Sequence, residues 1–179
     1  TYLPPWQSPF EAGDGVIDGQ IVQGTAGADT LAPQEVSLMA YMSFTPVATF
    51  TTTTSADGGF AFENLSTDPG IVYFLGTRYG GISYGTDLIS LTEVSPTLTL
   101  EIPVYETSSD DSGIRLTRVN WLVDHAPGQL RVRQIIGVAN DLDTTVTGHL
   151  VDGSDAPVTL ALPVPANATD VEFQDGALG

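Results

Sequence analysis

Two histidines, His125 and His149, are the side chains of this sequence best suited to acid–base or metal chemistry. His125 follows Asp124 in a turn that contains Pro and Gly, and His149 stands in a strand-like segment. A metal site or an acid–base pair needs several groups that converge on one point. An aspartate next to a histidine in sequence is too close to orient it in the usual way. We therefore expect structural or solvent-exposed roles for both histidines.

The segment Gly81–Gly85 fits the Gly-x-Ser-x-Gly pattern of serine hydrolases, with Ser83 at its centre. In those enzymes the serine sits on a sharp turn between a strand and a helix, and an acid and a histidine follow downstream. Here the surrounding sequence is typical of β-strands, so we interpret the segment as part of a β-hairpin. The chain contains no Cys, which excludes thiolate catalysis and Cys-ligated metals. These observations predict a protein that is not an enzyme and has no organic cofactor.

One group of acidic side chains could bind calcium. Glu106, Asp110 and Asp111 lie in a polar break where we expect two domains to meet. Carboxylate oxygens are the ligands that Ca²⁺ prefers, although no EF-hand pattern is present. The hypothesis is a calcium site at this break, and the alternative is a set of solvated turns. Calorimetric titration at millimolar calcium separates the two.

The charge balance restricts the partners. The chain has 22 acidic residues and five Arg but no Lys, and its net charge is −17. Such a charge repels phosphate backbones and anionic lipid headgroups, so nucleic acid and direct membrane insertion are poor expectations. High acidity without Lys or Cys favours a secreted or cell-surface location, with a signal peptide removed before Thr1. The alternative is that Thr1 marks an arbitrary boundary of the expressed chain.

Four of the five arginines lie between Arg115 and Arg133 and form a local positive patch. At strict period 2, Arg131 and Arg133 share one face of a strand, whereas Arg115 and Arg118 do not. These side chains either pair with nearby aspartates or contact the acidic face of another copy, which would give head-to-tail assembly. Arg131 and Arg133 are therefore candidate assembly contacts.

Residues 1–15 are rich in proline and show no helical or strand period, so we expect an extended arm. The arm either lies along its own domain or docks on a neighbouring molecule. In the second case Trp6 and Phe10 are the candidate anchors, because large aromatics dominate the energy of interfaces.

The remainder of the chain has β-type patterning with turn residues between short apolar segments, and no amphipathic helical period. An Asp57-Gly58 pair predicts a hairpin turn. The strands are expected over residues 16–22, 35–44, 47–55, 60–62, 71–78, 82–91, 97–105, 114–123, 129–138, 144–151 and 157–162.

Four features occur along residues 16 to about 100. They are Ile17-x-Gly19-x-Ile21, Val36-x-Leu38, a closing strand with Tyr73, and the segment Thr53-x4-Gly58-x-Phe60-x-Phe62-x2-Leu65. In these features the segment resembles carboxypeptidase regulatory-like domains, which are transthyretin-like β-sandwiches. The resemblance implies a sandwich without catalytic residues, used as a spacer or a binding unit. The second half of the chain carries no such motif, and only its strand density favours an immunoglobulin-like sandwich.

We therefore expect an all-β protein of two consecutive β-sandwich domains, with an arm at 1–15, a first domain at 16–106 and a second, incomplete one at 107–179. The expected function is structural, as a subunit or spacer of a cell-surface filament or envelope complex that binds other copies or other surface proteins. One alternative is a carbohydrate-binding or adhesion module that stacks glycans on Trp6, Trp121, Tyr79 or Tyr84. Another is an accessory domain of a larger secreted hydrolase.

Overall fold

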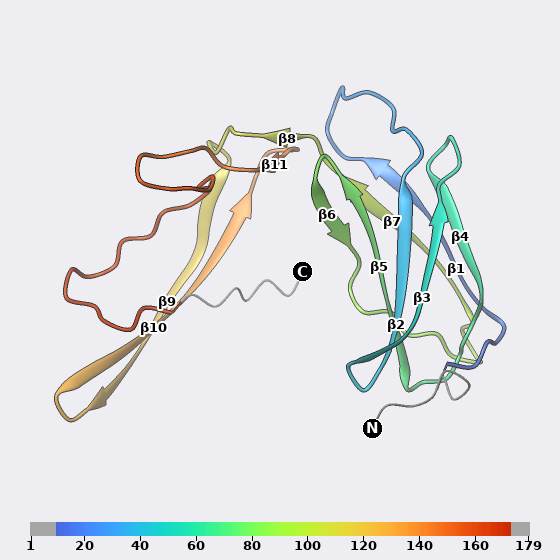
Figure 1. Ribbon diagram of the computed structural model, residues 1–179, viewed down its shortest axis with the longest axis horizontal. Helices are drawn as coiled ribbons and strands as arrows, with labels where there is room; N and C mark the ends of the chain where they lie inside the picture. Colours follow the sequence, from blue (N-terminus) through green and yellow to red (C-terminus); the bar gives the residue numbers. More distant parts are fainter. Residues whose placement is uncertain (1–9, 173–179) are drawn as a thin grey trace. The chain divides into compact units, whose positions relative to one another are not determined.

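The computed structural model describes residues 10–172 and contains β-strands but no helix in that range (Figure 1). None of these residues therefore forms a helix able to cross a bilayer. The contacts divide the chain into two compact units, of which unit 1 extends to Tyr105 and unit 2 covers Glu106–Val171. The expectation of an all-β chain is confirmed.

Unit 1 consists of two small sheets. The first has the order β4-β1-β7 and the second the order β3-β2-β5-β6. β1 pairs antiparallel with β4 and parallel with β7, and every neighbouring pair of the second sheet is antiparallel. The strands are β1 (Gly15–Gln23), β2 (Glu35–Met42), β3 (Thr45–Thr53), β4 (Gly59–Leu65), β5 (Ile71–Tyr79), β6 (Ile82–Gly85) and β7 (Thr97–Val104).

Alternate residues of both sheets point into one apolar core, as the period of 2 along a strand requires. On β5 the buried positions are Ile71, Tyr73, Leu75 and Thr77, while the residues between them are only half-buried. The apolar residues on which the family resemblance rests are core residues, with exposed fractions of 7% or less. Fourteen apolar side chains form this core: Ile17, Ile21, Val36, Leu38, Ala40, Phe60, Phe62, Leu65, Ile71, Tyr73, Leu75, Leu91, Ile102 and Val104.

The turn at Asp57-Gly58 forms, but the expectation that it closes a hairpin is wrong. β3 before the turn and β4 after it belong to different sheets, so the turn carries the chain from one sheet to the other. Gly58 has φ of +85°, and a Cβ there would lie 2.5 Å from the carbonyl oxygen of Ile21. Both the backbone conformation and the close approach therefore require glycine. The Ser55 hydroxyl donates to Asp57 and lowers the pKa of that carboxyl.

The expected strand at 82–91 is shorter in the structure, since only Ile82–Gly85 pair with β5. Beyond Gly85 the chain leaves the ladder and returns for one bridge, in which Ile89 pairs with Tyr73. This detour brings Leu91 into the core, where its side chain is 1% exposed.

Unit 2 contains one long hairpin and one short pair of strands. The hairpin is β9 (Ile114–Ala126) with β10 (Gln129–Asn140), and the short pair joins β8 (Thr107–Ser108) to β11 (Thr145–Val146) in parallel. The strands expected at 144–151 and 157–162 reduce to β11 and to a single bridge between His149 and Val158. Pro157, Pro163 and Pro165 lack the N–H donors that a ladder needs, which explains the irregular course of this segment. A second sandwich is thus not confirmed.

Tyr73 gives a test of the core of unit 1. Its buried hydroxyl donates to the carbonyl oxygen of Ser66 at 2.8 Å, and burial raises its pKa to about 12, above the ordinary value of 10.0. Tyr73→Phe should lower the free energy of unfolding by about 1–2 kcal/mol at neutral pH, because the Ser66 carbonyl loses its donor. Urea unfolding monitored by circular dichroism measures this loss.

The same residue predicts a pH dependence. The folded state holds the Tyr73 proton more tightly than the unfolded state. The protonated hydroxyl therefore contributes fully to the free energy of unfolding below pH 10, and this contribution is lost as the pH rises towards 12. Wild-type stability should therefore fall over this range by more than that of Tyr73→Phe. Equal slopes in the two proteins would contradict the role given to Tyr73.

Candidate functional site

The hairpin of β9 and β10 is the most distinctive feature of unit 2, and it has no other strand beside it among the described residues (Figure 1). Twelve residue pairs join the two strands, from Gln129 opposite Ala126 at the turn to Asn140 opposite Ile114 at the base. The turn between the strands contains Gly128 at φ of +81°. The outer edge of each strand therefore carries backbone groups that are available for pairing.

A β-bulge at Thr117 decides which residues share a face of this hairpin. Arg118 lies opposite Gly137 and Leu116 lies opposite Val138, so Thr117 is one extra residue on β9. A Cβ on Gly137 would lie 2.6 Å from the Thr117 hydroxyl, which explains the glycine at this place. Residues directly opposite each other in an antiparallel pair share a face, and the faces alternate along each strand. The bulge thus moves Leu116 to the same face as Val119.

One face of the hairpin, the apolar face, carries neither an arginine nor a carboxylate, and His125 lies on it near the turn. Trp121 lies near its middle, opposite Gln134, and is 57% exposed. Val132 is 48% exposed and lies opposite Val123. The apolar members of this face are Ile114, Leu116, Val119, Trp121, Val123, Leu130, Val132, Ile136 and Val138, all exposed except the half-buried Ile114 and Ile136.

The opposite face, the arginine face, carries all four arginines of unit 2. The expectation that Arg115 and Arg118 point to different faces is wrong. Thr117 is an extra residue between them, and the two arginines therefore lie on the same face, opposite Ala139 and Gly137. The members of this face are Arg115, Arg118, Asn120, Leu122, Asp124, Arg131, Arg133, Ile135, Gly137 and Ala139. Its charge of four Arg against one Asp contrasts with the net −17 of the chain.

Arg115 pairs internally, as one of the two interpretations of the patch predicted. Its guanidinium Nε lies 2.5 Å from the Asp141 carboxylate, and this contact ties the base of β9 to the turn after β10. The pair lowers the pKa of Asp141 and raises that of Arg115. Arg131 lies opposite Asp124 on the neighbouring strand, whereas Arg133 lies opposite Leu122. Arg115 and Arg131 therefore have an acidic residue beside or opposite them, whereas the residue opposite Arg133 is apolar.

Unit 2 has almost no interior. Among its residues whose burial the structure describes, only Gly148 is buried. Its large apolar side chains lie at the surface, including Leu150 at 70%, Val164 at 53% and Val171 at 63% exposure. All fourteen core side chains belong to unit 1. The hairpin is thus held by its own ladder and by few tertiary contacts.

Of the three residues proposed for calcium, Asp110 and Asp111 make local contacts just before β9, whereas Glu106 lies just before β8 and pairs with Thr145. Asp110 accepts from the backbone N–H of Ser112 at 2.9 Å, and Ser112 lowers the pKa of Asp110. The carbonyl oxygen of Glu106 accepts from Thr145 at 2.8 Å, and that of Asp111 from Ile114 at 2.9 Å. Over residues 10–172, no cluster of three or more acidic or histidine side chains could hold a metal ion. The calcium hypothesis gains no support from this geometry.

The residues that could have formed a catalytic set are spread over separate elements. Ser83 lies within β6 opposite Arg78, in an antiparallel hairpin, as the pattern of the surrounding sequence predicted. His125 lies opposite Leu130 near the turn of the long hairpin. His149 Nδ1 lies 4.0 Å from Asp111, and both side chains are about half exposed. General acid–base catalysis needs several groups that converge on one reacting atom. The contacts described for Ser83, His125 and His149 do not form such a group.

The aromatic residues predicted as assembly anchors or glycan platforms lie in different environments. Phe10 packs against Phe50, with ring centroids 5.3 Å apart, and lies beside the core of unit 1. Trp6 lies outside the described residues. Tyr84 donates its hydroxyl to the Tyr105 carbonyl at 3.0 Å, which gives it a structural role. Of the predicted glycan platforms that the structure describes, Trp121 is the one exposed on the hairpin.

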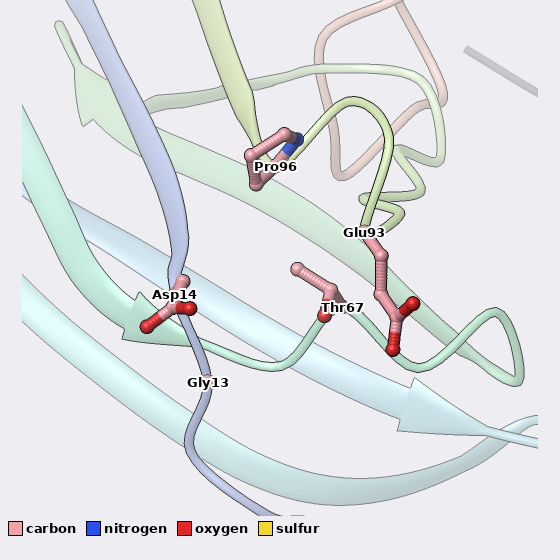
Figure 2. Close-up of a pocket in the computed structure, with 5 residues that line it drawn as sticks. All are labelled: Gly13, Asp14, Thr67, Glu93 and Pro96. Atoms are coloured by element: carbon pink, nitrogen blue, oxygen red, sulfur yellow. The ribbon is translucent and has the colours of Figure 1, made fainter.

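A hollow of about 370 Å³ lies in unit 1 and is shown in Figure 2. Gly13, Asp14, Thr67, Glu93 and Pro96 line it. Asp14 and Glu93 appear on either side of Thr67 in this view, and both are exposed. Two solvated carboxylates with one hydroxyl offer no nucleophile and base in contact, so the hollow carries no catalytic assignment.

Comparison of the chain with protein-family models, with curated proteins and with solved structures finds no match.

The uneven burial predicts uneven local stability. In dilute solution, amide hydrogens of β9 and β10 should exchange about a hundredfold or more faster than those of β2 and β5, because few buried contacts resist opening of the hairpin. Hydrogen exchange measured by mass spectrometry checks this. Similar protection of both regions would show that unit 2 has an interior of its own.

Proposed function

We propose that this chain is a non-catalytic assembly protein in which unit 1 is the stable body and the hairpin of unit 2 is the docking element. The observation that carries the proposal is the exposure of an apolar face along a hairpin of twelve residue pairs. Soluble monomers rarely leave a contiguous apolar surface of this kind uncovered, and such surfaces commonly mark interaction sites.

Unit 1 fits the role of a body or spacer. We infer that its two sheets form a β-sandwich of the carboxypeptidase regulatory-like type, since one core is shared by inward-facing residues of both sheets. The packing of Ile17, Ile21 and Phe60 in that core agrees with the motif on which the resemblance rests. Such a sandwich needs no catalytic residue, and it would serve as a stable body to which the hairpin of unit 2 is attached.

A secreted or cell-surface location fits the composition. The absence of Lys and Cys and the net charge of −17 suit a protein that stays soluble outside the cell and in salt. The same charge makes copies repel one another, so assembly requires surfaces of the opposite sign or apolar surfaces. The hairpin offers both, one on each face.

The arginine face would contact acidic surfaces of other copies. The segment Ile114–Asn140 has a net charge of +3, whereas the other residues include 21 acidic side chains and a single Arg, Arg78. Charge complementarity of this kind guides association and fixes orientation. Repeated contacts between the hairpin of one copy and the acidic surface of the next would extend an assembly, as in a filament.

Reversing the charge of two arginines tests this role. Arg131→Glu with Arg133→Glu should abolish species larger than a dimer, because the hairpin would then repel the acidic partner surface. Light scattering and negative-stain images at low salt measure the outcome. Raising the salt concentration should weaken the wild-type assemblies as well, since exposed charges are screened.

Arg78→Glu is the matched control, because Arg78 is the exposed arginine of unit 1. It changes the net charge in the same direction without altering the hairpin, and assemblies should persist. If the double variant and the control assemble equally well, the arginine face has no part in assembly.

A further inference from the structure

We propose that the apolar face of the hairpin pairs with the same face of a second copy, forming a two-fold symmetric dimer. This inference rests on the proposed assembly function and names the partner of one of its two surfaces. The arginine face then points outward on both sides of the dimer and stays free for the charged contacts described above.

Charge segregation is the first argument for a second copy. Like charges brought together at an interface strongly oppose association, and desolvating any unpaired charge costs free energy. All four arginines and Asp124 of the hairpin lie on the other face, and the polar members of the apolar face are the uncharged Gln134 near its middle, Asn140 at its base and His125 near the turn. Two copies of this face can therefore meet without burying an arginine or a carboxylate.

The bulge at Thr117 supports the same conclusion. If Thr117 paired regularly with Val138, every residue before it on β9 would shift by one position. Leu116 would then lie on the arginine face and Arg115 on the apolar face. The bulge thus keeps the apolar face uncharged over its whole length, from Leu130 near the turn to Val138 near the base. The absence of charged side chains along the whole face would not stabilise a surface that stays open to water. An interface between two copies of the same face depends on this absence, because any charge there would be buried against its own copy.

Size is the third argument. Twelve residue pairs give a ribbon about 40 Å long and roughly 10 Å wide, while a stable dimer buries on the order of 800 Å² of accessible surface per partner. An occupant must therefore cover the full length of the ribbon with apolar side chains. A second hairpin has the required length and pattern, and face-to-face packing of sheets places such ribbons about 10 Å apart.

Trp121 makes burial of this face measurable. Trp6 is the second tryptophan of the chain, so Trp6→Phe leaves Trp121 as the sole tryptophan emitter. As the protein concentration rises and the mass measured by sedimentation doubles, the emission of Trp121 should shift to the blue and its quenching by acrylamide should fall several-fold. Both changes should also occur in Arg131→Glu with Arg133→Glu, since these arginines lie outside the proposed interface.

Two substitutions on β10 supply the matched comparison. Val132 on the apolar face and Ile135 on the arginine face are each 48% exposed. Val132→Asp should weaken the dimer at least about a hundredfold, because two symmetry-related carboxylates would be buried against apolar side chains. Ile135→Asp should change the dissociation constant little. If Val132→Asp fails to fold, Val132→Thr takes its place in the comparison, because threonine keeps the shape and strand preference of valine. Val132→Thr should weaken the dimer to a smaller degree than is expected for Val132→Asp.

The outcomes separate this inference from the function on which it rests. Dimers in which Trp121 stays fully quenchable, or equal effects of Val132→Asp and Ile135→Asp, overturn the proposed interface but leave assembly standing. A chain that stays monomeric at every concentration also overturns it. Dimers with shielded Trp121 that never grow larger support the interface and contradict the assembly through the arginine face. A monomer with shielded Trp121 contradicts both, because the chain itself would then cover the face.

Discussion

The β-bulge at Thr117 sets the facing of every residue that precedes it on β9. One extra residue places Leu116 opposite Val138 and brings Arg115 and Arg118 to a common side, so that all four arginines lie on one face and the other face carries none. Gly137 makes room for the bulge, because a side chain there would meet the Thr117 hydroxyl. The two-sided character of the hairpin, and with it both proposed contacts, depends on this local irregularity.

Burial differs sharply between the two units. Unit 1 satisfies its apolar residues internally, with Tyr73 and Leu38 fully buried and the Tyr73 hydroxyl bonded to Ser66. In unit 2, Trp121 and Leu130 remain more than half exposed. A two-stranded hairpin is marginally stable by itself in water, since one ladder cannot offset the conformational entropy of its residues. Its apolar side chains gain most of their stabilising free energy only when another surface covers them.

Much of unit 1 could be predicted from sequence, because each strand there alternates regularly and one face is buried. The motif residues Ile17, Phe60 and Tyr73 lie in the core. The pairing of strands was harder, since an Asp-Gly turn fits both a hairpin and a passage between two sheets. In unit 2 the alternation on β10 was visible, but that on β9 was hidden by Thr117, because a bulge breaks the period without leaving a sequence signal. The separation of apolar and arginine faces on which the proposed docking rests could not be recognised until the register was known.

The charge of the chain explains why the proposed assembly uses both faces of the hairpin. At a net charge of −17, long-range repulsion opposes the approach of two copies, and an apolar face acts only at contact. Arginines reduce that repulsion at the hairpin itself, where Asp124 is the single acidic residue. Arginine suits this place better than lysine, because its planar guanidinium binds carboxylates with two parallel hydrogen bonds and is more weakly hydrated. The absence of lysine therefore leaves the cationic surface of this protein confined largely to one ribbon, and association that uses it has a defined direction.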